Sequence, residues 1–138
     1  MDCRIVFYSA RKTSFCERAL QKSFLELDLT LTGATFATDA GSLGAQLVDA
    51  FSQCDLTFVI GGLDFNDYRS VRDIISRAAA ASVIDEYKKL RNEKGEDGYV
   101  LRAQDQLLII LPDEPEQIED IMQGPINRYI KINDNARV

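Results

Sequence analysis

The sequence predicts an α/β fold in which a mainly parallel sheet lies between two layers of helices. Short apolar runs rich in β-branched and aromatic residues alternate along the chain with longer stretches whose apolar residues recur at helical spacing. Strands separated by helices imply right-handed crossovers, which make the strands parallel and place helices on both faces. With 138 residues, the chain is long enough for one core, and we expect a single domain over residues 1–138.

A strand and a helix are expected first. Residues 4–8 are an apolar run of strand formers, followed by a turn-like segment. Residues 15–27 carry apolar side chains at helical spacing, which predicts an amphipathic helix. Thr13 or Ser14 can begin this helix by accepting a hydrogen bond from a backbone N–H group. The members of its apolar stripe are Phe15, Cys16, Ala19, Leu20, Phe24 and Leu27.

A second strand and helix follow. Residues 29–37 alternate apolar residues with threonines, which predicts a half-buried strand with a candidate bulge at Gly33. The next helix can be capped by Thr38, Asp39 or Ser42. Its apolar stripe consists of Leu43, Leu47, Ala50 and Phe51.

The second half of the chain contains two strongly apolar runs. Residues 56–60 and 106–111 lack polar alternation, which is typical of strands buried on both faces. Between them, residues 68 to about 91 have a helical pattern, and residues 99–101 form a weaker strand candidate. A charged loop over residues 91–98 separates these two segments.

The end of the second apolar run is marked by prolines. Pro112 and Pro115 end the strand and begin a helix, for which Asp113 is a candidate cap. The apolar positions of this last helix are Ile118, Ile121 and Met122.

Composition excludes several classes of function. The net charge of −6 opposes binding to nucleic acid, because that affinity comes mainly from Lys and Arg at phosphates. The chain has no histidine, which removes Ser-His-Asp and Cys-His catalysis. Its three cysteines lack a metal-binding or disulfide spacing and are expected to be buried thiols. No apolar run is long enough for a membrane helix and no secretory pattern begins the chain, so we expect a cytoplasmic protein.

The candidate site follows the first buried run of the second half. Gly61 and Gly62 allow a sharp turn and the close approach of another molecule, and Asp64 and Asp67 follow within a few residues. Ligands of open α/β sheets bind outside the carboxyl ends of the strands. We therefore expect these residues, together with Asp39, to line a pocket.

Four loops are expected to share that rim of the sheet, over residues 9–13, 39–42, 61–67 and 112–114. Amides at the glycine turn can hold an anionic group, and the carboxylates can accept hydrogen bonds from a heterocycle. Asp39 and Asp67 are candidate ligands for Mg²⁺. The competing interpretation is that these carboxylates only cap helices and turns.

The order of these segments resembles the molybdopterin-binding domain family, which includes molybdenum cofactor biosynthesis proteins and the N-terminal domain of CinA. The resemblance rests on Asp39 before a helix, on CDLTFVIGGL at residues 54–63 and on LIILPDEP at residues 108–115. It implies a pocket for molybdopterin or a nucleotide lined by Asp39, Gly61, Gly62 and Asp67. It also implies a homo-oligomer, with a trimer favoured.

The chain departs from the family pattern at two loops. Asp64 and Asp113 stand where the family usually has glycine, which places negative charge where an anion would approach. We therefore expect a divergent, degenerate pterin- or nucleotide-binding site. The alternative is a noncatalytic scaffold or regulatory domain that acts through self-association.

Overall fold

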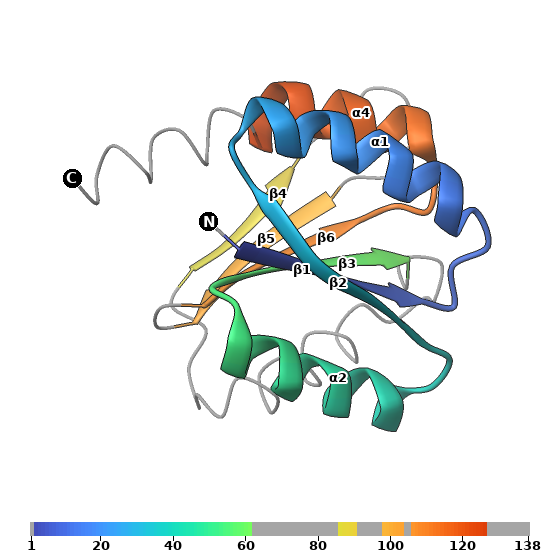
Figure 1. Ribbon diagram of the computed structural model, residues 1–138, viewed down its shortest axis with the longest axis vertical. Coiled ribbons are helices and arrows are strands. Elements are labelled where there is room, and N and C mark those ends of the chain that lie inside the picture. The colour runs from blue at the N-terminus through green and yellow to red at the C-terminus, as the bar shows by residue number, and fades with distance from the viewer. Residues whose placement is uncertain (1, 62–85, 91–97, 104–105, 127–138) are drawn as a thin grey trace.

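A six-stranded sheet with the strand order β2-β1-β3-β6-β5-β4 forms the middle layer of the protein. The computed structural model describes residues 2–61, 86–90, 98–103 and 106–126. Helices α1 and α4 cover one face of the sheet and α2 covers the other (Figure 1). The elements are β1 (Asp2–Tyr8), α1 (Thr13–Glu26), β2 (Thr30–Ala37), α2 (Ala40–Gln53), β3 (Leu56–Gly61), β4 (Glu86–Leu90), β5 (Gly98–Ala103), β6 (Gln106–Leu111), α4 (Pro115–Ile121) and the π-helix η1 (Met122–Ile126).

The strand pairing confirms the predicted three-layer α/β sandwich with a mainly parallel sheet. Strand β1 pairs in parallel with β2 and β3, and β3 pairs in parallel with β6. Strands β5 and β4 add antiparallel pairs at the far edge. The carboxyl ends of β1, β2, β3 and β6 therefore lie along one rim.

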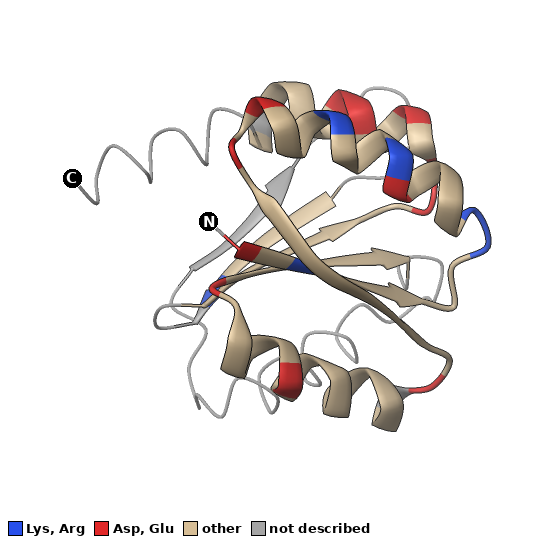
Figure 2. Ribbon diagram, in the orientation of Figure 1, with Lys and Arg blue, Asp and Glu red and all other residues tan. Residues whose placement is uncertain are grey.

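Two apolar cores fill the space between the layers, because alternate residues of each strand point to opposite faces. The core beneath α1 and α4 includes Ile5, Phe58 and Ile109, and the core beneath α2 includes Val6, Val59 and Leu108. Charged residues lie mainly on the helices and in the loops (Figure 2). Within the described part of the chain, no helix is long and apolar enough to cross a membrane.

The predicted stripe of α1 is correct except at its first member. Cys16, Ala19, Leu20 and Phe24 are buried, but the Phe15 side chain is 60% exposed. Phe15 lies in the first turn, next to buried Cys16 but on the solvent side of the helix. The expected burial of the cysteines is confirmed, since Cys3, Cys16 and Cys54 are all buried free thiols.

The predicted helix over residues 68–91 is wrong at its end. Residues 86–90 form strand β4, which pairs antiparallel with β5, and residues 68–85 lie outside the described residues. The sequence EYKKL has no strong preference, so pairing with a distant strand decides its structure. The weak strand expected at residues 99–101 is confirmed as the centre of β5.

The bulge of β2 lies one residue before the predicted position. Cys3 pairs with Leu31 and Arg4 pairs with Gly33, which leaves Thr32 as the extra residue. The Thr32 hydroxyl donates a hydrogen bond to the carbonyl oxygen of Cys3 at 3.1 Å. The extra residue is thus held by its own side chain.

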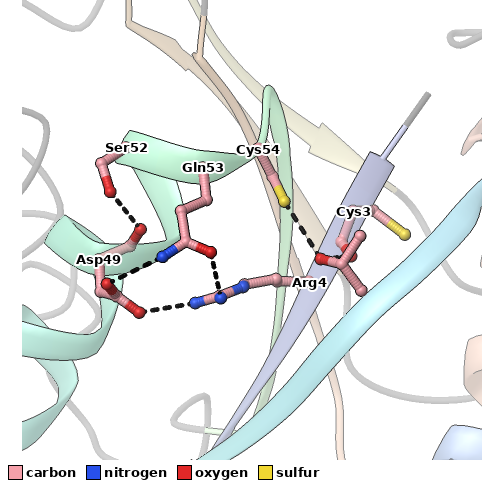
Figure 3. A network of polar contacts seen from close by, with 7 residues as sticks. Cys3, Arg4, Asp49, Ser52, Gln53 and Cys54 are labelled. Atoms are coloured by element: carbon pink, nitrogen blue, oxygen red, sulfur yellow. Dashed lines mark hydrogen bonds and ion pairs between the residues drawn. The ribbon is translucent and has the colours of Figure 1, made fainter.

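An arginine on β1 fastens the end of α2 to the sheet (Figure 3). Arg4 Nη1 lies 2.7 Å from a carboxylate oxygen of Asp49, and Arg4 Nη2 donates to Gln53 Oε1 at 2.5 Å. Gln53 Nε2 in turn donates to Asp49 at 3.3 Å. This network lies near the amino end of β1, at the opposite edge from the rim.

We expect Thr57→Val to stabilise the protein by about 1 kcal/mol, because the substitution removes a buried hydroxyl that has no partner among the described residues. Thr57 is fully buried in β3, and within the described part of the chain its hydroxyl oxygen has no hydrogen-bond partner. Urea unfolding measures the change. Thr32→Val is the comparison, because it removes a bonded hydroxyl and should destabilise. An equal loss of unfolding free energy in the two variants would mean that the Thr57 hydroxyl is paired in the folded protein.

Candidate functional site

The rim at the carboxyl ends of the parallel strands is the candidate functional site. The chain leaves β1 through α1 to reach β2 on one side, and then returns through α2 to β3 on the other side of β1. The strand order therefore reverses at β1, and such a switch point is where open α/β sheets bind ligands. The loops after β1, β2 and β6 meet this rim, and β3 ends there at Gly61, whereas residues 62–67 of the fourth expected loop lie outside the described residues.

Gly61 ends β3 in a conformation that requires glycine. Its φ angle is +98°, and a Cβ atom added there would lie 2.4 Å from the carbonyl oxygen of Tyr8. The predicted need for glycine is therefore correct, because the β1 backbone lies too close for a Cβ atom. Gly62, Asp64 and Asp67 of the predicted site lie outside the described residues.

The loop after β1 begins with a strained residue. Ser9 has a φ angle of +49°, a left-handed conformation that non-glycine residues adopt infrequently and that clusters at functional sites. Its backbone N–H donates to the carbonyl oxygen of Ala37 at 2.8 Å, and its hydroxyl donates to that of Thr38 at 3.4 Å. These bonds hold the end of β1 against the end of β2.

Asp113 reaches from the loop after β6 to the start of α1. Its carboxylate accepts hydrogen bonds from the backbone N–H of Arg11 at 2.7 Å and from that of Lys12 at 3.2 Å. The prediction that Asp113 caps its own helix is wrong, because Glu114 is the N-cap of α4 and makes no side-chain cap bond. The amides at the start of α1 lack intrahelical partners, so they offer the carboxylate better donors.

The start of α1 also differs from the sequence-based expectation. Its N-cap residue is Lys12, which makes no side-chain cap bond, so neither Thr13 nor Ser14 caps the helix. Asp113 accepts the N–H of this N-cap residue from a position 101 residues away. The sequence predicts Asp113 on the rim, but no local pattern signals a contact over this separation.

A thiol adds a third donor to the Asp113 carboxylate. Cys16 Sγ donates to Asp113 Oδ1 at 3.4 Å. Burial, together with the hydrogen bond to Asp113, raises the pKa of the Cys16 thiol to about 12. The thiol therefore keeps its proton at neutral pH and remains a donor rather than a nucleophile.

Basic and acidic residues on the two loops are paired. Lys12 Nζ lies 2.9 and 2.8 Å from the two carboxylate oxygens of Glu114. The hydrogen bond with Glu114 raises the pKa of the Lys12 ammonium, which stays charged. The charge of Lys12 at the start of α1 is thus already matched by an acidic side chain of the chain itself.

Asp39 is the described carboxylate of the predicted site, and it caps α2. Its Oδ1 accepts a hydrogen bond from the backbone N–H of Ser42 at 2.7 Å, and its side chain is exposed at the rim. Asp39 is therefore the N-cap of α2, which was one of the three candidates for that position. Among residues 2–61, 86–90, 98–103 and 106–126, no group of three His, Cys, Asp or Glu side chains is arranged to hold a metal ion.

Solved structures with this fold come from CinA and molybdenum cofactor proteins. CinA from Thermoplasma acidophilum, described as of unknown function, shares 15% sequence identity at a TM-score of 0.68, with 94% of this chain and 97% of that chain covered. The molybdopterin biosynthesis Mog protein from Mycobacterium ulcerans shares 17% identity at 0.64, with the same two coverages. Molybdenum cofactor biosynthesis protein B shares 14% identity at 0.65, with coverages of 96% and 94%.

The resemblance seen in the sequence is thereby confirmed at the level of the fold. No family model matches the sequence. No curated protein matches it either. At these identities the likeness concerns the backbone arrangement, and the chemistry of the rim must be argued from this chain's own residues.

Proposed function

We propose that the rim binds a pterin or a nucleotide and that its catalytic capacity is degenerate. The observation that carries the proposal is the convergence of Ser9, Asp39 and Gly61 at the carboxyl ends of β1, β2 and β3, where the strand order reverses. The fold shared with molybdenum cofactor proteins supports the pterin class of ligand. We propose that the protein carries out this function in the cytoplasm, as the sequence leads us to expect.

Each residue of the proposed site has a distinct task. Backbone amides at Gly61 and Gly62 face an anionic or carbonyl group of the ligand. Asp39 keeps an exposed carboxylate at the rim while it caps α2, so it can accept a hydrogen bond from a heterocycle. Asp67 joins Asp39 as a ligand of Mg²⁺.

Mg²⁺ fits this site only in part. Asp39 supplies a carboxylate, the oxygen donor that Mg²⁺ prefers, but one of its oxygens already accepts the Ser42 amide. The described residues alone form no metal centre. The proposed ion therefore depends on Asp67, with water and ligand oxygens in the remaining positions.

Degeneracy follows from charge at the rim. Asp64 and Asp113 replace glycines of the family pattern, and Asp113 already occupies two amides at the start of α1. A phosphorylated ligand meets repulsion there unless a divalent ion intervenes. We therefore expect weak binding and no robust adenylylation of a pterin.

Calorimetry with ATP or a stable pterin, with and without Mg²⁺, tests the proposal. We expect weak binding alone and an affinity about tenfold higher with Mg²⁺, which corresponds to about 1.4 kcal/mol. Asp39→Asn and Asp67→Asn should abolish the gain from Mg²⁺. The Asp39→Asn fold should persist, because asparagine caps helices as well as aspartate does.

The control is Asp55→Asn, which removes the same charge from an exposed residue at the amino end of β3. It should keep the response to Mg²⁺. Tight binding that does not need the metal, accompanied by turnover, would contradict the degenerate site.

A scaffold function is the second candidate, and exposed apolar side chains favour it. Four large apolar residues lie open to solvent on α1, β2 and α2, namely Phe15, Leu25, Phe36 and Val48. Exposed apolar side chains are available for contact with other copies of the chain, and we propose a trimer as the assembly, as the resemblance to the family implies. Light scattering tests this function. A trimeric mass, together with the absence of ligand binding in calorimetry, would support it, whereas a monomer at micromolar concentration would contradict it.

A further inference from the structure

The start of α1 holds an anion that the chain itself supplies. Both carboxylate oxygens of Asp113 are engaged: Oδ2 accepts the Arg11 amide at 2.7 Å, and Oδ1 accepts the Lys12 amide at 3.2 Å and the Cys16 thiol at 3.4 Å. Three donors, from the β1–α1 loop and the first turn of α1, thus surround one charged group of the β6–α4 loop. Such donors bind carboxylate and phosphate oxygens alike.

The contact is not a by-product of capping α4. Asp113 directly precedes the N-cap residue of that helix, yet its carboxylate points to α1, and α4 has no side-chain cap. Glu114, the next residue, takes the Lys12 ammonium in the same way. Both acidic residues of this loop therefore occupy donors of the β1–α1 loop.

We propose that Asp113 is a specificity-determining residue whose carboxylate excludes anionic ligand groups from the start of α1. The inference rests on the proposed function, since it states which ligands the rim selects. An anionic group that approached these amides would have to displace Asp113 or meet its charge at close range. Specificity often depends on such a repulsive element.

The substrate class that follows is a heterocycle without an anionic group at this position. A nucleoside or a pterin that lacks phosphate meets no repulsion from Asp113. A nucleotide or a phosphorylated pterin binds only if its phosphate lies away from the start of α1. Removal of the Asp113 charge should turn the same amides into an anion site.

Inorganic phosphate is the first probe, with the backbone amide resonances of Arg11 and Lys12 in NMR spectra as the readout. In Asp113→Asn, phosphate should shift these two resonances saturably, whereas in the wild type it should not. Asp113→Gly removes the acceptor entirely and provides a second variant in case the asparagine side chain keeps the amides occupied. Glu116→Gln is the control, since it removes one exposed charge from the first turn of α4, and it should behave as the wild type does.

Adenosine and AMP are the second probe. The ratio of their affinities should shift towards AMP by about tenfold in Asp113→Asn and stay unchanged in Glu116→Gln, a size expected for removing one nearby like charge. Equal phosphate shifts in wild type and variants would overturn the inference. So would folded Asp113 variants in which phosphate leaves both amide resonances unmoved.

The two probes separate this inference from the proposed function. If neither adenosine nor AMP binds any variant but phosphate moves the Arg11 and Lys12 resonances in the Asp113 variants, ligand binding fails and the exclusion by Asp113 stands. If the wild type binds adenosine and AMP equally and phosphate moves these resonances in no variant, ligand binding stands and the exclusion by Asp113 fails.

Discussion

Gly61→Ala is expected to destabilise the protein by about 3 kcal/mol or more, because it combines backbone strain with a clash. A φ angle of +98° is costly for any residue with a Cβ atom, and that atom would lie 2.4 Å from the carbonyl oxygen of Tyr8. The oxygen belongs to the backbone of the neighbouring central strand, so it cannot move aside without loss of the β1–β3 pairing. Urea unfolding, followed by circular dichroism, measures the loss.

Gly33→Ala is the matched control for this substitution. Gly33 lies in β2, has no positive φ angle, and its added Cβ atom would meet only Arg4 Nε at 3.9 Å, an ordinary contact. The free energy of unfolding of Gly33→Ala should stay close to that of the wild type or rise by about 0.4–1 kcal/mol. A Gly61→Ala variant as stable as Gly33→Ala would contradict the geometry assigned to the end of β3.

Phe58→Ala is expected to cost about 3–5 kcal/mol, the usual range for removal of a buried aromatic side chain. Phe58 is fully buried on the central strand β3, and the centroid of its ring lies 5.1 Å from the centroid of the Phe24 ring on α1. The substitution opens a cavity between α1 and the sheet. Because the amides that bind Asp113 lie directly before α1, the packing of α1 also positions the rim.

Phe15→Ala provides the comparison on the same helix. Its ring is 60% exposed, so its removal should change the free energy of unfolding by no more than about 0.5 kcal/mol. Thermal melts of both variants show the contrast. Similar losses at the two positions would mean that α1 does not pack on the sheet as described.

The strands of the parallel sheet and the cap of α2 could be predicted because their signals are local. Residues 56–60 and 106–111 are almost entirely apolar, and the structure buries all of them except Gln106. Asp39 accepts a hydrogen bond from Ser42 only three residues away. A pattern within a few residues therefore identifies both.

Other features depend on contacts that no local pattern contains. Strand β4 is polar and becomes a strand through pairing with β5. Asp113 resembles a local helix cap in the sequence, but it binds amides 101 and 102 residues away because those donors are free of intrahelical bonds. The burial of Cys16 follows from the local apolar spacing, but its hydrogen bond to that carboxylate does not.

The most direct test of ligand binding at the rim is a map of amide resonances during titration with a pterin or adenosine, in the presence of Mg²⁺. We expect the largest shifts at Ser9, Asp39 and Gly61, which end the parallel strands on one side of the sheet. Arg4, Asp49 and Gln53, near the opposite edge, should remain unmoved. Shifts confined to that opposite edge, or none at saturating ligand, would contradict a binding site at the carboxyl ends of the strands.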